Sequence, residues 1–130
     1  MSTTLSIMIE KAIQSKGSHY DLAIIIHYFY QNDYCVVNDK WFKKVENEKW
    51  QEMEAPNDLY INISKKIFDV LMEEYNKIYE KSKIADTLDM SDLYKEKARK
   101  LQRIANNCKM VNYKNNLLRE CKPLFTVDEL

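Results

Sequence analysis

The side chains that could carry out nucleophilic or metal chemistry are few and far apart. Cys35, Cys108 and Cys121 could each act as a nucleophile with His27 as its base, but no local motif brings such a pair together. His19 and His27 are two helical turns apart, and no Cys-x-x-Cys pair accompanies them, as a zinc site would need. We therefore expect lone buried thiols in a reducing compartment and no bound metal.

Residues suited to phosphate binding or acid–base catalysis are also sparse. Gly17 is the only glycine, so the chain has no glycine-rich loop whose backbone N–H groups could hold a nucleotide. Paired catalytic acids need burial or close neighbours to separate their pKa values. The clustered carboxylates instead fall on an expected hairpin and loop in solvent: Glu46, Glu48, Glu52, Glu54 and Asp58. The sequence predicts no enzyme and no cofactor in this segment.

Positive charge is concentrated in one part of the chain. The formal net charge is zero, yet residues 93–122 carry +7 and the remainder carries −7. The acids of this segment are Glu96 and Glu120, and its nine basic residues are Lys95, Lys97, Arg99, Lys100, Arg103, Lys109, Lys114, Arg119 and Lys122. Such asymmetry is informative where the net charge is not.

Three of these cations form what we call the basic row, Lys95, Arg99 and Arg103, at i, i+4 and i+8 of an expected helix. Such a row can follow a phosphate backbone with salt-sensitive, sequence-independent affinity, and Lys114 and Arg119 could extend it. The alternatives are an ordinary solvated face and neutralisation by the acidic part of the chain, within the domain or across a subunit contact. The opposite, buried face is expected to hold Leu93, Lys97, Leu101, Ile104, Ala105 and Cys108.

Aromatic residues on an expected hairpin offer a second kind of contact. Trp41, Phe42 and Trp50 could stack on bases. Large aromatic side chains more often cover a small core, and we favour that interpretation here.

Composition and hydrophobic periodicity predict an α+β fold, a mainly helical single domain over residues 1–130 with a small antiparallel β-hairpin or meander. Helices are expected over residues 4–15 and 18–31, with Ser18 as a cap, and strands over residues 34–37, 41–45 and 50–53. A third helix should start at Asn62 or Ser64 and lead into a polar, mobile connection over residues 81–90. Ser91 should cap a fourth helix through about Lys109, and a last helix over residues 114–121 should end at Pro123.

No secretion signal follows Met1, and the longest apolar run, residues 22–26, is far too short to cross a bilayer. We therefore expect an intracellular protein with no membrane partner.

An ordered set of residues resembles the domain just before the superfamily 3 helicase module in helicase–primases of poxviruses and other large DNA viruses, shared by related phage and plasmid primases. The matching positions are Gly17, Tyr20, Asp21 and Ala23 in a helix, then Trp41, Lys49 and Trp50 in a hairpin, then Ile63, Ser64 and Tyr75 in the next helix. Residues 112–125 resemble the family's final helix before the motor. The similarity covers about residues 17–130.

This resemblance implies that the parent protein is a ring-shaped, usually hexameric DNA helicase fused to a primase, using ATP and Mg in neighbouring domains. It also implies a location in the host cytoplasm or a viral factory. It brings no catalytic residue to this chain, which lacks Walker motifs, an arginine finger in context and a primase carboxylate motif. Because the family continues towards its ATPase where this chain stops, we expect a piece of a longer protein.

The expected function is a non-catalytic linker or collar domain in viral DNA replication, contacting the DNA backbone and supporting ring assembly. Its expected contacts are Lys95, Arg99, Arg103, Lys114 and Arg119. One alternative is a protein-interaction or scaffold domain that binds no nucleic acid. Another is a small dimeric regulator, although no recognition helix for a major groove is apparent.

Overall fold

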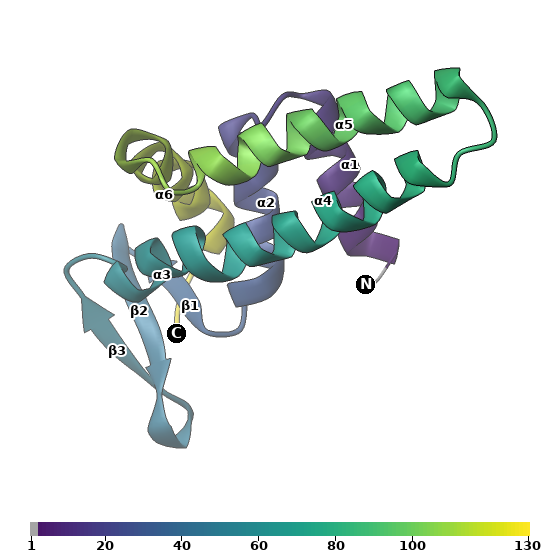
Figure 1. Cartoon of the computed structure of the whole chain (residues 1–130). Coiled ribbons are helices and arrows are strands. Elements are labelled where there is room, and N and C mark those ends of the chain that lie inside the picture. The colour runs from purple at the N-terminus through teal and green to yellow at the C-terminus, as the bar shows by residue number, and fades with distance from the viewer. Residues whose placement is uncertain (1–2) are drawn as a thin grey trace.

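Two long antiparallel helices run along one side of the molecule, with the other elements beneath and beside them (Figure 1). The structure is a computed structural model that describes residues 3–130. Its helices are α1 (Thr3–Gln14), α2 (His19–Tyr30), α3 (Asn57–Asn62), α4 (Phe68–Lys83), α5 (Leu88–Asn107) and α6 (Val111–Phe125), and its strands are β1 (Tyr34–Val37), β2 (Lys40–Val45) and β3 (Lys49–Met53). A π-helical turn, Ile63–Ile67, joins α3 to α4. With α3, the π turn and α4 counted as one continuous helix, the described part is one domain of five helices, 70% helical, with a small three-stranded antiparallel sheet, which confirms the predicted fold class.

The turn between α1 and α2 is fixed by its contacts with the carboxyl-terminal half. Gly17 adopts a positive φ of 80°, and a Cβ added there would lie 2.9 Å from Cγ1 of Ile104 on α5. The Tyr113 hydroxyl on α6 donates a 2.7 Å hydrogen bond to the Gly17 carbonyl. As predicted, Ser18 caps α2, accepting a hydrogen bond from the backbone N–H of Asp21. This turn therefore lies directly against α5 and α6.

The sheet is a meander in the order β1-β2-β3, as its turn residues indicated. Asn38 and Asp39 both have positive φ, as the tight turn between β1 and β2 requires. The face with Tyr34, Val36 and Trp41 is buried, and the Trp41 ring lies 5.4 Å from that of Phe125 on α6. The sheet is thereby anchored to the end of α6.

The third helix begins at Asn57, and the predicted start at Asn62 or Ser64 is wrong. The reason lies in the spacing of fully buried residues, which recur every four positions: Leu59, Ile63, Ile67 and Leu71. In a regular α-helix this spacing drifts by about 40° at each step. The wider π turn removes part of that drift and keeps all four side chains on the core side.

The connection between α4 and α5 is shorter than predicted, since only residues 84–87 lie outside the two helices. Thr87, not Ser91, caps α5 by accepting a hydrogen bond from the backbone N–H of Met90. The Ser91 hydroxyl instead donates to the Ser82 carbonyl, 2.7 Å away, and ties the two helices together. The polar composition that indicated a mobile loop is that of two exposed helix ends.

Helix α6 is longer than predicted, beginning at Val111 and including Pro123. Pro123 lies in the last turn of α6, where its missing N–H removes one hydrogen bond near the end of the helix, and its carbonyl accepts from the backbone N–H of Thr126. After α6, the backbone N–H of Val127 donates a hydrogen bond to the carbonyl of Val36 in β1.

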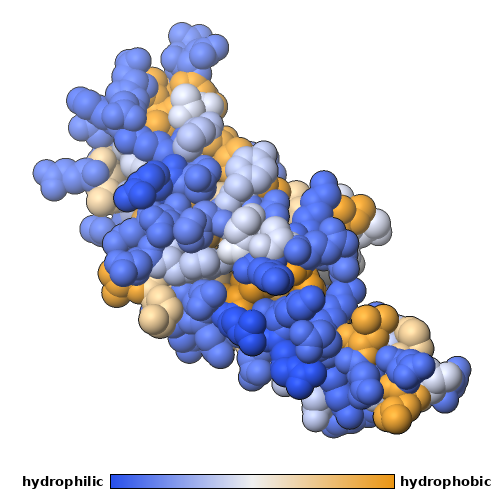
Figure 2. All heavy atoms as spheres, turned by 90° about the horizontal axis from the view of Figure 1, so that it is seen from above, coloured by the Kyte–Doolittle hydropathy of each residue, from blue (hydrophilic) through white to orange (hydrophobic). Residues whose placement is uncertain are grey.

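The surface seen from above, along α5, is mainly hydrophilic (Figure 2). Hydrophobic side chains gather at the end that holds the α4–α5 connection, on the right of Figures 1 and 2. Leu93, predicted to be buried, is 60% exposed there, because the first turns of α5 extend past the body that covers the rest of that helix. Within residues 3–130, no helix combines the length and the apolar character needed to cross a bilayer.

Candidate nucleic-acid interface

Helix α5 presents the basic row to solvent because its other face is held by the core. Its buried residues contact α4 and the α1–α2 region, and they are Ala98, Leu101, Ile104 and Ala105. Lys95, Arg99 and Arg103 are all exposed, as the helical wheel predicted. Cys108, just beyond the helix, is fully buried, also as predicted.

Two members of the basic row have no acidic partner. Arg99 donates to Oε2 of Glu96, 3.1 Å away, in an exposed i, i+3 pair. Lys95 and Arg103 form no ion pair with any residue in the described part of the chain. Exposed pairs of the Arg99–Glu96 kind contribute little and exchange readily, so Arg99 remains able to contact an anion.

The fold adds two cations that the sequence analysis did not include in this surface. Lys16, Lys100 and Arg103 line one shallow hollow together with Glu96. Lys16 comes from the α1–α2 turn, where Gly17 holds the chain against Ile104. Lys100 was counted in the basic segment, but nothing local to Lys16 indicated that it would lie beside α5. We call Lys16, Lys95, Lys100 and Arg103 the cationic surface.

The two predicted extensions of the row on α6 differ in outcome. Lys114 is buried, only 8% exposed, and its ammonium lies 4.0 Å from the centre of the Tyr60 ring. This side chain packs against α3 and does not face solvent, so its predicted place on a DNA-contacting surface is wrong. Arg119 is exposed as expected, with its guanidinium donating to Oδ1 of Asn116 at 3.2 Å. It remains a peripheral candidate.

Other cations of the basic segment are neutralised within the fold. Lys97 pairs with Glu10 of α1, and Lys122 pairs with Asp39 in the β1–β2 turn at 2.9 Å. Lys109 lies 4.0 Å from the centre of the Phe68 ring, a cation–π contact. Acids from distant segments therefore pair with two cations of the +7 segment, whereas Lys95, Lys100 and Arg103 have no acidic partner among the described residues.

The aromatic residues of the sheet occupy two different environments. Trp41 is buried, as expected for a core residue. Phe42 and Trp50 are only half-buried and lie on the opposite face of the sheet, so the core interpretation fails for them. Lys44 places its ammonium 5.1 Å from the centre of the Trp50 ring while pairing with Glu48.

The thiols and His27 are held in environments that favour their neutral forms. Burial raises the pKa values of Cys108 and Cys121 to about 12, and burial also raises the pKa of Cys35. Burial lowers the pKa of His27, whose ring packs edge-on against Phe125 at 4.9 Å. These thiols stay protonated at neutral pH and have little nucleophilic character. Within residues 3–130, no three His, Cys, Asp or Glu side chains converge to hold a metal ion.

No protein-family model and no curated protein matches this chain. The resemblance to the helicase–primase domain therefore stays a prediction based on the residues quoted above, and the function must be argued from the surface itself.

Proposed function

We propose that this chain is a non-catalytic accessory domain that contacts the phosphate backbone of DNA through its cationic surface. The observation that carries the proposal is the hollow that Lys16, Lys100 and Arg103 line together with Glu96, with the exposed Lys95 earlier on the same helix. Cations from three separate turns of α5 and from the α1–α2 turn thus form one surface.

The spacing of the basic row suits a phosphate backbone. Residues four apart on an α-helix are separated by about 6 Å along its axis. One strand of duplex DNA presents a phosphate about every 3.4 Å of axial rise, so alternate phosphates match the row. Lys and Arg side chains at this spacing bind phosphates without reading bases.

We place this activity in a viral helicase–primase, as the linker or collar domain preceding the motor. The ordered motifs from Gly17 to Tyr75 support this placement. In this proposal ATP and Mg act in the neighbouring helicase domain, hexameric ring assembly brings several cationic surfaces around the DNA, and the domain itself positions nucleic acid.

Fluorescence anisotropy with labelled single- and double-stranded DNA tests the proposal. Four phosphate contacts predict a slope of log Kd against log salt of about 3.6 in magnitude for duplex DNA and about 2.8 for a single strand. Lys95→Glu with Arg103→Glu should reduce this slope by about 2 and weaken binding at low salt by tenfold or more. The matched control is Lys49→Glu with Lys65→Glu, which makes the same charge change at exposed lysines on β3 and in the π turn.

Equal loss of affinity in both double variants would show a response to net charge alone and would contradict the proposed surface. Absence of binding by the unmodified chain at low salt would contradict DNA contact altogether. It would favour the alternative, a protein-interaction or scaffold domain. The exposed hydrophobic end of the α4–α5 hairpin is the observation that favours this alternative.

A further inference from the structure

The connection between α4 and α5 carries an exposed hydrophobic surface that the fold leaves uncovered. Ile84 is 79% exposed and Leu88 is 75% exposed, and Met90 and Leu93 are exposed beside them. We call these four residues the apolar tip. It lies at the far end of the helical hairpin from the sheet (Figure 1), where hydrophobic side chains gather in Figure 2. Exposed apolar side chains gathered in this way mark interaction surfaces more often than those scattered singly.

The apolar tip is surrounded by negative charge. Asp86, Asp89 and Asp92 are exposed, and none of them forms an ion pair within the described residues. Two cations flank it that form no ion pair within the described residues, Lys95 three positions after Asp92 on α5 and Lys81 on α4. Lys81 lines the hollow beside Ile84 and Met90.

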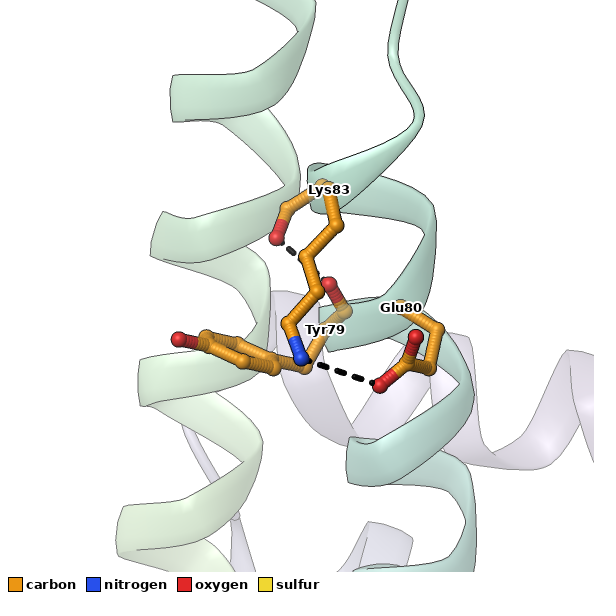
Figure 3. Close-up of polar contacts among 4 residues, drawn as sticks. Tyr79, Glu80 and Lys83 are labelled. Atoms are coloured by element: carbon orange, nitrogen blue, oxygen red, sulfur yellow. Dashed lines mark hydrogen bonds and ion pairs between the residues drawn. The ribbon is translucent and has the colours of Figure 1, made fainter.

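The other lysine of this part of α4, Lys83, already has an acidic partner in Glu80. Its ammonium donates to Oε1 of Glu80 at 3.3 Å and lies 5.0 Å from the centre of the Tyr79 ring (Figure 3). The three aspartates outnumber Lys81 and Lys95, so the tip carries a net negative charge. A partner for this surface must supply apolar contacts ringed by cations, and an anionic lipid surface would be repelled.

The opposite end of α5 has the complementary character. Met110 and Val111 are exposed there, 60% and 61%, just beyond the helix. Lys100 and Arg103 lie about two to three turns before them, and Lys16 joins this group across the shallow hollow. We call this region the basic end. It combines exposed apolar side chains with positive charge, as the apolar tip combines them with negative charge.

We propose that the apolar tip of one copy of this chain binds the basic end of a second copy, in a head-to-tail contact. One copy cannot join the apolar groups of its own two ends, because the 20 residues of α5 between Leu88 and Met110 hold them about 30 Å apart. A second copy supplies both an exposed apolar surface and the opposite charge. Such complementarity directs association and orientation. The inference rests on these exposed residues and does not depend on DNA binding.

A head-to-tail contact has a distinctive consequence. Each copy keeps one unused tip and one unused basic end, so association continues into a closed ring or an open chain. The contact is small, so we expect a Kd in the micromolar range or weaker for the isolated chain. Added salt should weaken it, because exposed charges are screened.

Sedimentation velocity on the whole chain without nucleic acid, from roughly 10 µM to 1 mM, tests the proposal. The unmodified chain should grow in mass with concentration. Asp89→Lys with Asp92→Lys should weaken self-association about tenfold or more, and so should Lys100→Glu with Arg103→Glu. Mixing the two variants should restore association, since each retains the end that the other has lost and the reversed ends also match.

Three results would overturn the head-to-tail contact. The first is a monomer at every concentration. The second is normal association of the Lys100→Glu, Arg103→Glu variant alone, which would indicate a tip-to-tip contact. The third is a mixture that associates no better than its components. Circular dichroism of each variant checks that helicity is intact.

A second pair of variants separates apolar contact from charge. Leu88→Ser with Leu93→Ser should reduce self-association about tenfold, whereas Ile7→Ser should not, because Ile7 is similarly exposed but lies on α1. An equal response of both would overturn the assignment to the tip. None of the tip residues belongs to the cationic surface, so a failure here leaves the DNA proposal unaffected, and a failure of DNA binding leaves this one standing.

Discussion

Replacing Gly17 with alanine tests whether the α1–α2 turn is fixed by its contact with α5. Gly17 has a φ of 80°, which an L-residue adopts at a cost of about 1–2 kcal/mol. The new Cβ would also lie 2.9 Å from Cγ1 of Ile104 and 3.1 Å from the Tyr113 hydroxyl. Overpacking of this kind in a filled core typically costs about 1–3 kcal/mol.

The two costs together predict that Gly17→Ala lowers the free energy of unfolding by about 2–5 kcal/mol. This is a large part of the roughly 5–15 kcal/mol that stabilises a typical domain. Urea denaturation followed by circular dichroism measures the loss directly, provided that the dependence on urea stays parallel to that of the unmodified chain.

Lys16→Gly is the matched control in the same turn. Lys16 has a φ of 59°, so glycine would relieve strain there while increasing the freedom of the unfolded chain. These effects oppose each other, and the net change should stay below about 1 kcal/mol. A loss below about 1 kcal/mol for Gly17→Ala as well would refute the reasoning, because neither the positive φ nor the contact with Ile104 would then have its expected cost.

Three further predictions concern the core. Trp41→Ala should lower the free energy of unfolding by about 3–5 kcal/mol, whereas Trp50→Ala should lower it by about 1 kcal/mol because the ring of Trp50 is half-exposed. Equal losses for the two variants in thermal and urea unfolding would contradict the assigned environments. Burial lowers the pKa of His27, so the unfolded chain binds more protons as the pH falls through 6.5, and stability should decrease from pH 7.5 to 5.5. His27→Gln should flatten that part of the profile, and an unchanged slope would exclude His27 as its source. Cys108 and Cys121, with pKa values raised to about 12, should react with a thiol reagent at pH 8 only as fast as the chain unfolds, and rapid labelling of either would disprove their burial.

The parts of the fold that the sequence predicted are those set by local signals. Gly17 ends one helix and Ser18 begins the next because a positive φ and a capping hydroxyl depend only on nearby atoms. The β1–β2 turn follows in the same way from Asn38 and Asp39, which tolerate positive φ. Such features can be read from a few neighbouring residues.

The parts that the sequence did not predict depend on contacts between distant segments. The start of the third helix at Asn57 depends on a π turn that brings Leu59 and Ile63 into the core. Leu93 has the periodicity of a buried residue, yet no element reaches far enough to cover it. Periodicity identifies an apolar face but does not show where the body of the domain ends.

The same distinction applies to the candidate site. The basic row was predicted because three cations at i, i+4 and i+8 share a face whatever the rest of the fold does. Lys114 had the same charge but packs on Tyr60, and Lys16 joined the surface from a turn 84 positions before Lys100. Net charge in a segment therefore predicted that a cationic surface exists, while its membership was decided by tertiary packing.

The two proposals share Lys16, Lys100 and Arg103, and this overlap has a physical consequence. A guanidinium or ammonium that pairs with an aspartate of a neighbouring copy is less available to a phosphate, so contacts at the basic end compete. Lys95 lies on the same exposed face but two turns nearer the apolar tip, outside the basic end. In an assembled array Arg99, midway along α5, would remain open to phosphates while the apolar tip and the basic end are covered. Arg99 would then be the member of the basic row that holds nucleic acid in the assembled state, and the basic end, with Arg103, would exchange between DNA and a neighbouring copy.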